Sequence, residues 1–154
     1  MGYEYLLREA GDRGLIVREK RFESKAKGLC KGNVIGDNKN IETNVEKCCI
    51  LAEEIGHHYT TVGNILDQSK LDNRKQERRA RVWAHERLIP LARFVQAHRD
   101  GIRNHHELAE YLGVTEQFLH EAIERYKEKY GKLVQVNDVH LCLEPLGVIE
   151  LFDF

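Results

Sequence analysis

The stretch LAEEIGHHYTT, residues 51–61, places two glutamates and two histidines inside a helical pattern of apolar residues. Along residues 45–60 the apolar positions recur every three to four residues, which is typical of a helix with one buried face. Thr43 followed by Glu46 has the spacing of a capping box, so we expect this helix to run over 43–60. The polar cluster borders the buried stripe, where polar side chains need partners.

Two of these side chains have the spacing of metal ligands. Glu53 and His57 are four residues apart, and residues four apart share one face of a helix. In the zinc-peptidase pattern H-E-x-x-H, the first and fifth positions bind the metal and the glutamate at the second activates water. Here the string reads E-E-I-G-H, so Glu54 and His57 match, and Glu53 stands at the first-ligand position. Carboxylates bind zinc at ~2.0–2.2 Å, which makes Glu53 a chemically acceptable ligand.

A second helix supplies a candidate for the third ligand that a catalytic zinc usually takes from the protein. The pattern predicts this helix over 73–87, ending before Pro90 because the residue before a proline disfavours the helical conformation. Glu77 shares one of its faces with Ala80 and Ala84. Small side chains let two helices approach closely, and a carboxylate at the head of such a face needs a partner.

We therefore predict that the two helices pack together and bring Glu53, His57 and Glu77 to one zinc site. The alternative is a solvated helix face, on which Glu53 and His57 form an ion pair worth about 0.2–0.5 kcal/mol. His58 lies on a different face, where it orients substrate or only packs.

The remaining sequence predicts a small sheet and further helices. Alternating segments at 15–22, 28–36 and 39–42, separated by glycines, predict an antiparallel meander. Residues 63–73 read as a loop, and residues 133–152 as a terminal strand or hairpin. Further helices are expected at 3–10, at 90–99 and twice within 104–129, where Gly113 separates the two and Thr115 caps the second.

Composition bounds the class of protein. The chain has 154 residues, of which 42% are hydrophobic and 32% charged, and its net charge is −1. These values fit a soluble, globular, helix-rich protein and give no global attraction to nucleic acid or to an anionic membrane. The order of the predicted elements, strands then helices then strands with helices dominating, predicts a compact α+β domain. Without an apolar run near the ~20 residues that span a bilayer, we expect a cytoplasmic protein. We expect a core over residues 1–100 that carries the N-terminal sheet, and a helical subdomain with the C-terminal strand over 101–154, packed as one unit with the core.

The segments LAEEIGHHYTTVGNILDQ (51–68) and NRKQERRARVWA (73–84) together resemble the ImmA/IrrE family of metallopeptidases. The common family form reads H-E-x-G-H-h, and then E-x-x-A-x-x-F/W-A after a loop. The resemblance implies a mostly helical, zincin-like α+β domain with a small antiparallel sheet and a C-terminal helical subdomain. By it, His57 and Glu77 are zinc ligands, Glu54 is the catalytic glutamate, and Glu53 departs in residue type at the first-ligand position. It also implies a partner, a helix-turn-helix repressor of a mobile element or prophage.

The segment HHELAEYLGVTEQFLHEAIERY (105–126) resembles a helix-turn-helix. A helix that reads DNA needs basic or amide side chains near its N-terminus, whereas this second helix is rich in glutamate. We therefore expect no specific nucleic-acid binding by residues 104–129. The basic run at 74–81 is the strongest cationic patch. Such a run is usually a solvated helix face, and the alternative is a surface that meets an acidic partner.

Two functions follow from these patterns. The first is a zinc-dependent endopeptidase acting on the repressor, in which zinc polarises the scissile carbonyl and Glu54 takes a proton from water and passes it to the leaving amine. The second is a non-proteolytic anti-repressor that inhibits by binding, which Glu53 favours. A weaker third reading is a DNA-binding regulator.

Overall fold

The computed structural model describes residues 2–22, 27–60 and 70–150, and of residues 70–73 the backbone alone. The chain forms two compact units that divide between Leu88 and Ile89. The loop predicted at 63–73 lies mostly outside the described residues, and a helix has already begun at Lys70. The division into residues 1–100 and 101–154, packed as one unit, stays a prediction.

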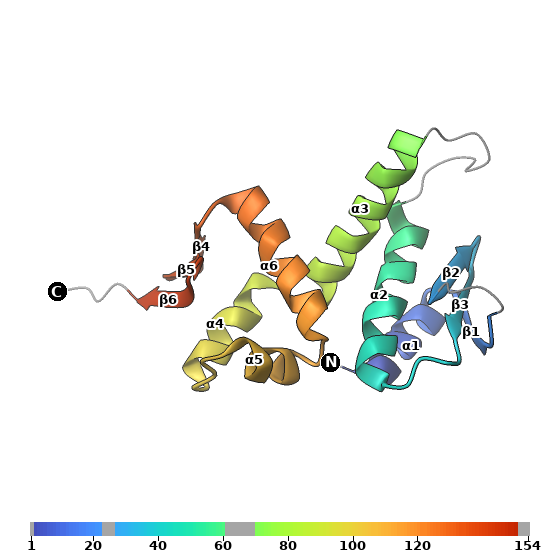
Figure 1. Ribbon diagram of the computed structural model, residues 1–154, viewed down its shortest axis with the longest axis horizontal. Coiled ribbons are helices and arrows are strands. Elements are labelled where there is room, and N and C mark those ends of the chain that lie inside the picture. Colours follow the sequence, from blue (N-terminus) through green and yellow to red (C-terminus); the bar gives the residue numbers. More distant parts are fainter. Residues whose placement is uncertain (1, 23–26, 61–69, 151–154) are drawn as a thin grey trace. The chain divides into compact units, whose positions relative to one another are not determined.

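The first unit is built around one central helix. Its elements are α1 (Tyr3–Asp12), β1 (Ile16–Lys20), β2 (Gly28–Lys31), β3 (Val34–Asn38), α2 (Asn44–Thr60) and α3 (Lys70–Leu88) (Figure 1). Helix α2 packs against α1, α3 and the sheet. The amide of Glu46 donates to the Thr43 hydroxyl at 3.2 Å, so the predicted cap is confirmed. Leu51 and Ile55 are buried, as the apolar stripe requires.

The sheet of this unit differs from the predicted antiparallel meander. Its order is β1-β3-β2, with β1 parallel to β3 and β2 antiparallel to it. The predicted third strand at 39–42 is wrong, because the Asn38 side chain accepts from the amide of Asn40 at 3.0 Å and turns the chain there. Strand β3 carries the buried residues Ile35 and Asp37, which explains its central place. A meander places β1 beside β2, whereas β1 pairs with the buried strand β3, which separates it from β2.

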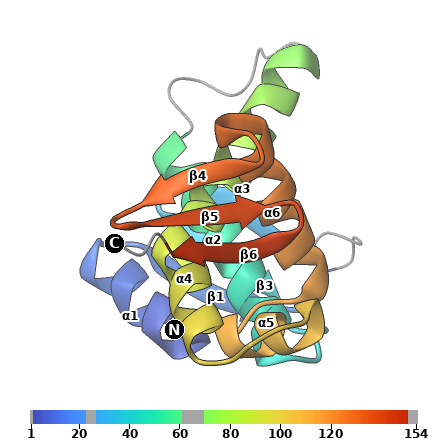
Figure 2. The ribbon, with the colours of Figure 1, turned by 90° about the vertical axis from the view of Figure 1, so that its left-hand side faces the viewer.

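The second unit is a helical cluster followed by a sheet. Its elements are α4 (Leu91–Arg99), α5 (His105–Leu112), α6 (Glu116–Tyr130), β4 (Leu133–Val136), β5 (Val139–Leu143) and β6 (Leu146–Glu150). Gly113 ends α5 in the left-handed conformation, and Thr115 caps α6 by accepting from the Phe118 amide at 3.0 Å. The C-terminal strands form an antiparallel sheet in the order β4-β5-β6 (Figure 2), one strand more than a hairpin. The predicted α+β class, mostly helical with small sheets, is confirmed.

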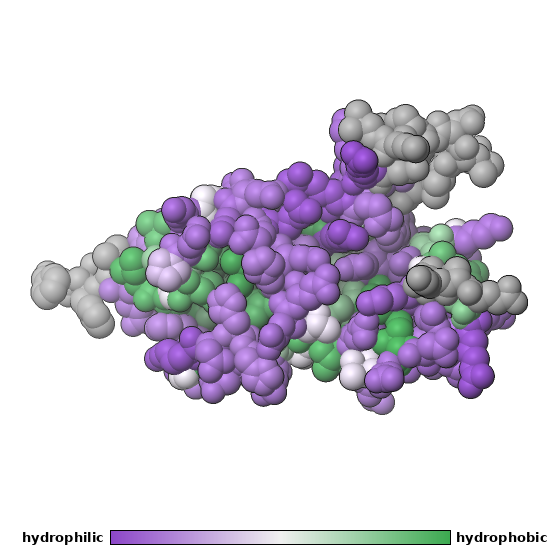
Figure 3. Space-filling model, viewed as in Figure 1, coloured by the Kyte–Doolittle hydropathy of each residue, from purple (hydrophilic) through white to green (hydrophobic). Residues whose placement is uncertain are grey.

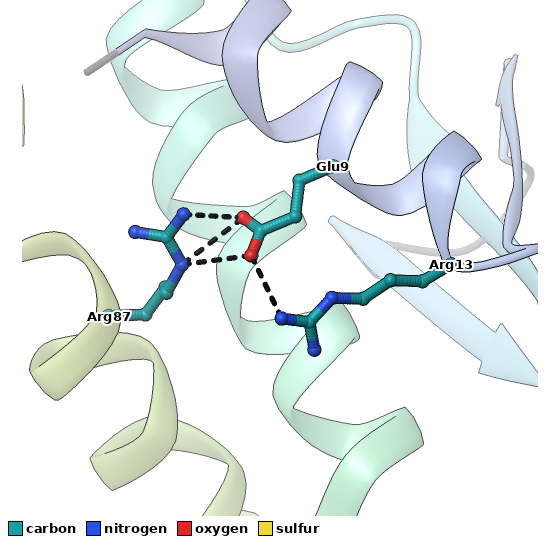
Figure 4. A network of polar contacts seen from close by, with 3 residues as sticks. All are labelled: Glu9, Arg13 and Arg87. Carbon is teal, nitrogen blue, oxygen red and sulfur yellow. Dashed lines mark hydrogen bonds and ion pairs between the residues drawn. The ribbon is translucent and has the colours of Figure 1, made fainter.

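A forked ion pair fastens α1 to α3. The guanidinium of Arg87 donates to both carboxylate oxygens of Glu9, at distances of 2.6–3.2 Å (Figure 4). Arg13 approaches the same carboxylate at 3.4 Å, and its guanidinium lies 5.0 Å from the ring centroid of Tyr59 on α2. Forked, partly buried pairs of this kind fix geometry better than single surface contacts. The first and last helices of the unit are thereby held against the same central helix.

A buried carboxyl ties α1 to the sheet. The Tyr3 hydroxyl lies 2.9 Å from Oε1 of Glu19 and 2.9 Å from Oδ2 of Asp37. A phenol has one hydrogen to donate, so both contacts are favourable only when one of the carboxyls carries a proton. Asp37 is fully buried, and within the described part of the chain its Oδ1 has no hydrogen-bond partner. Burial raises the pKa of Asp37 to about 6, although the Tyr3 hydrogen bond opposes the shift.

This pKa predicts a specific pH dependence of stability. Because the pKa is raised on folding, the protonated carboxyl favours the folded state, and that advantage is lost as the pH rises from about 4 through about 6. Asp37→Asn stays neutral throughout. Its free energy of unfolding relative to the parent should therefore increase by roughly 2–3 kcal/mol between pH 4 and pH 8. Urea unfolding of both proteins across this range measures it, and a difference that does not change with pH would contradict the assignment.

Candidate functional site

The site depends on a very close approach of α2 and α3. Gly56 faces the backbone of Ala80, and a Cβ added to Gly56 would lie 2.4 Å from the Ala80 carbonyl oxygen. Ala80 and Ala84 are fully buried between the helices. The absence of a side chain on one helix and the small side chains on the other thus allow backbone-to-backbone contact. The close packing of the two helices that was predicted from Ala80 and Ala84 is thus observed.

The close approach brings two of the predicted site residues into contact. Nε2 of His57 on α2 lies 3.3 Å from Oε1 of Glu77 on α3. Their hydrogen bond raises the pKa of His57 and lowers that of Glu77, and it is the largest contribution to each shift. The His57 side chain is 21% exposed and that of Glu77 is 55% exposed, so the pair is open on one side. A cation or a substrate atom can reach it from solvent.

Glu54 lies beside this pair and faces the sheet. Its side chain is partly buried, and burial raises the pKa of its carboxyl to about 7. The charge of His57 opposes this shift. Three further carboxyls raise the pKa: Glu77, Glu53 and Asp37. A carboxyl with a pKa near neutrality exchanges protons readily in both directions, which is the property that general acid–base chemistry needs.

Glu53 does not join His57 and Glu77 in a three-donor group. Among the described residues, no set of three or more histidine, cysteine, aspartate or glutamate side chains is arranged to hold a metal ion. His57 and Glu77 are donors of kinds that zinc accepts and come from two packed helices, so two positions fit a zinc ion. The third does not. The charge of Glu53 also acts on Lys27, where it adds to the larger effect of Glu46 in raising the lysine pKa.

His58 makes a contact with the sheet. Its Nδ1 lies 2.9 Å from the carbonyl oxygen of Gly32 in the turn between β2 and β3, and its ring meets that of Tyr59 edge-on. With a proton on Nδ1, the imidazole donates to this carbonyl. The contact ties the β2–β3 turn to α2. The structure therefore gives His58 a packing role, and a role in orienting substrate stays a prediction.

Two neighbours of Glu54 were missed by the sequence patterns. Cys30 on β2 is half-buried, and burial together with the charge of Glu54 raises the pKa of its thiol to about 11. Gly28 lies on the same strand, two residues earlier, and its Cα faces the Glu54 side chain. Alternation along residues 28–36 indicates that positions 28 and 30 share a face, but nothing in the sequence says that this face meets α2.

The basic run of α3 borders an open groove of about 480 Å³. The groove is lined by Thr60, Lys75, Arg78, Arg79, Val82, Trp83 and Glu86. On the face shown in Figure 3, hydrophilic side chains dominate the surface over α3. Arg79 and Arg81 are exposed, as a solvated helix face requires.

The fold and this cluster define a class, a mostly helical α+β domain in which two closely packed helices present a histidine and glutamates. Residues 10–124 match the family model Peptidase_M78, described as the IrrE N-terminal-like domain, and the chain belongs to this family. The resemblance seen in the sequence is thus confirmed, and with it a metallopeptidase-like function of the IrrE/ImmA type. No curated protein and no solved structure matches the chain. Within the described residues, no helix is long and apolar enough to cross a membrane.

The contact between Gly56 and Ala80 predicts the effect of one added methyl group. Gly56→Ala should force the two helices apart and lower the free energy of unfolding by about 1–3 kcal/mol or more, because backbone atoms cannot yield as a flexible side chain does. Gly11→Ala on α1 is the matched control, since its Cβ would meet no atom within 4 Å. That change should stabilise the protein by roughly 0.5–1 kcal/mol. Urea unfolding measures both, and a Gly56→Ala protein as stable as the parent would show that the helices are not in backbone contact.

Proposed function

We propose that the chain is a zinc-dependent endopeptidase-like protein that inactivates a helix-turn-helix repressor of a mobile element or prophage. The observation that carries the proposal is the contact of His57 with Glu77 across the packed α2 and α3, with Glu54 beside it. These residues occupy the ligand and catalytic positions of the motifs that the sequence shares with ImmA/IrrE metallopeptidases. Membership in the family supports the peptidase class, and the repressor is our proposal.

Each residue has a role in this proposal. His57 and Glu77 would hold the metal, and Glu53 lies four residues from His57 on the same helix face, at the position of the first ligand in the family motif. A bound zinc ion would supply Lewis-acid chemistry at the scissile carbonyl. Glu54 takes a proton from the attacking water and hands it to the leaving amine. Its pKa near 7 suits both transfers.

The second candidate function is a non-proteolytic anti-repressor that acts by binding. Two observations favour it. Glu53 replaces a neutral histidine by an anion at the first-ligand position, and an added negative charge makes a bound ion a weaker Lewis acid. In addition, the described residues hold no complete three-donor metal group. In this alternative the repressor is held by the protein without being cut.

Glu54→Gln separates the two candidates. The amide is nearly isosteric with the carboxyl and cannot accept the proton of water, so a peptidase should keep its fold and lose repressor cleavage by ~10²–10⁴-fold. A protein that acts by binding should keep its relief of repression. The measurement follows repressor fragments and repressor–operator release side by side, with the parent and Glu54→Gln. Full release by Glu54→Gln, with no fragment from the parent either, would exclude the peptidase and leave the anti-repressor.

We also propose that the second unit binds a protein partner or supports the catalytic core, and that it does not bind nucleic acid specifically. Helix α6 begins with exposed Glu116, whose carboxylate lies 2.5 Å from Nδ1 of His106 on α5. Further along α6, Glu124 pairs with Lys127 at 2.8 Å. An anionic start of the reading helix repels phosphates. Binding to duplex DNA at two salt concentrations should be weak, and a tight complex with a steep salt dependence would overturn this view.

A further inference from the structure

Strand β2 is fastened to helix α2 at both of its ends. Just before the strand, Nζ of Lys27 lies 2.8 Å from Oε1 of Glu46, in the first turn of α2. Just after it, the carbonyl oxygen of Gly32 accepts a hydrogen bond from His58, in the last turn of α2. The strand therefore runs alongside the helix, with one polar contact at each of its ends. Whatever side chain faces α2 between these two points determines how closely strand and helix approach.

Gly28 lies where the strand passes close to the helix. A Cβ added to Gly28 would lie 2.9 Å from both Cγ and Oε1 of Glu54, and 2.8 Å from Cγ2 of Ile50. Distances below 3.0 Å are sterically forbidden, so one of the groups would have to move. Ile50 is β-branched and stiff at its Cγ2, and Cγ of Glu54 is close to the helix backbone. Unlike Gly32, whose φ is +61°, Gly28 is not needed for a left-handed backbone conformation. Its role is to leave space.

We infer that Gly28 is a positioning residue for Glu54, because its missing side chain leaves the room in which the Glu54 carboxyl lies between β2 and α2. The inference rests on the proposed function, because only there does Glu54 act as the catalytic carboxyl. A larger residue at position 28 would push the Glu54 carboxyl out of this space and away from the pair of His57 and Glu77. A reacting group displaced by about 1 Å can lose ~10²-fold in rate.

A double-mutant cycle on stability tests the contact without any need for activity. Four proteins are compared by thermal unfolding: the parent, Gly28→Ala, Glu54→Ala and the double variant. Gly28→Ala should lower the melting temperature by several degrees in the parent. The drop should be smaller in the Glu54→Ala background, because Cγ and Oε1 of Glu54 are gone and only the contact with Ile50 remains. Gly11→Ala, placed in both backgrounds, is the control and should show no such coupling.

Two outcomes decide the contact. An equal drop from Gly28→Ala in both backgrounds would overturn the inference. If Gly28→Ala alone fails to fold, recovery of cooperative unfolding in the double variant supports the inference, and continued failure to fold overturns it.

Cleavage kinetics test whether the contact positions a reacting group. If the parent cleaves the repressor, Gly28→Ala should lower kcat on the order of 10–100-fold and leave KM nearly unchanged. A fall in rate that only matches the loss of folded protein would show a structural role and contradict positioning. If the parent does not cleave, the proposed peptidase function fails, and the stability cycle still decides whether Gly28 sets the place of Glu54.

Discussion

The contact between Gly56 and Ala80 is the constraint on which the site depends. A helix pair that touches backbone to backbone has one relative position, since a Cβ at Gly56 would lie 2.4 Å from a carbonyl oxygen. His57 follows Gly56 directly, and Glu77 lies about one turn before Ala80, so their 3.3 Å contact is a consequence of that position. The fork from Arg87 to Glu9 and the buried Asp37 hold α1 and the sheet around the same central helix. Chemistry at the site thus follows from packing.

The charge balance of the site distinguishes a peptidase from a binding protein. Glu53, Glu54 and Glu77 place three carboxyls near one imidazole. The hydrogen bond with Glu77 and the charges of the three carboxylates raise the pKa of His57. The pKa of Glu54 is raised first by burial and then by the neighbouring carboxylates. A cation would relieve this repulsion, and a divalent ion is the natural candidate because imidazole and carboxylate both bind zinc. The arrangement of the described residues supplies two such donors from separate helices. Glu53 decides whether the third position is completed by the protein.

Much of this arrangement could be predicted from the sequence. The period of the apolar residues in α2, the cap at Thr43 and the alanine face of α3 gave the two helices and their close packing, because each is encoded within a few neighbouring residues. The sheet was predicted less well. Which strand is central depends on the burial of β3 and on an Asn38 turn, and strand order is not written in local patterns. For the same reason Gly28 and Cys30 could not be assigned to the surroundings of Glu54.

Metal content tests the central claim most directly. The parent and Glu77→Ala are purified in parallel, with Gln76→Ala on the same helix as a control, and zinc is measured per chain. About one zinc ion per chain is expected in the parent and the control, and loss of most of it in Glu77→Ala, because Glu77 supplies the donor from the second helix. A parent without bound zinc, or a Glu77→Ala protein that retains the parent's zinc, would contradict the claim that α2 and α3 together hold the metal.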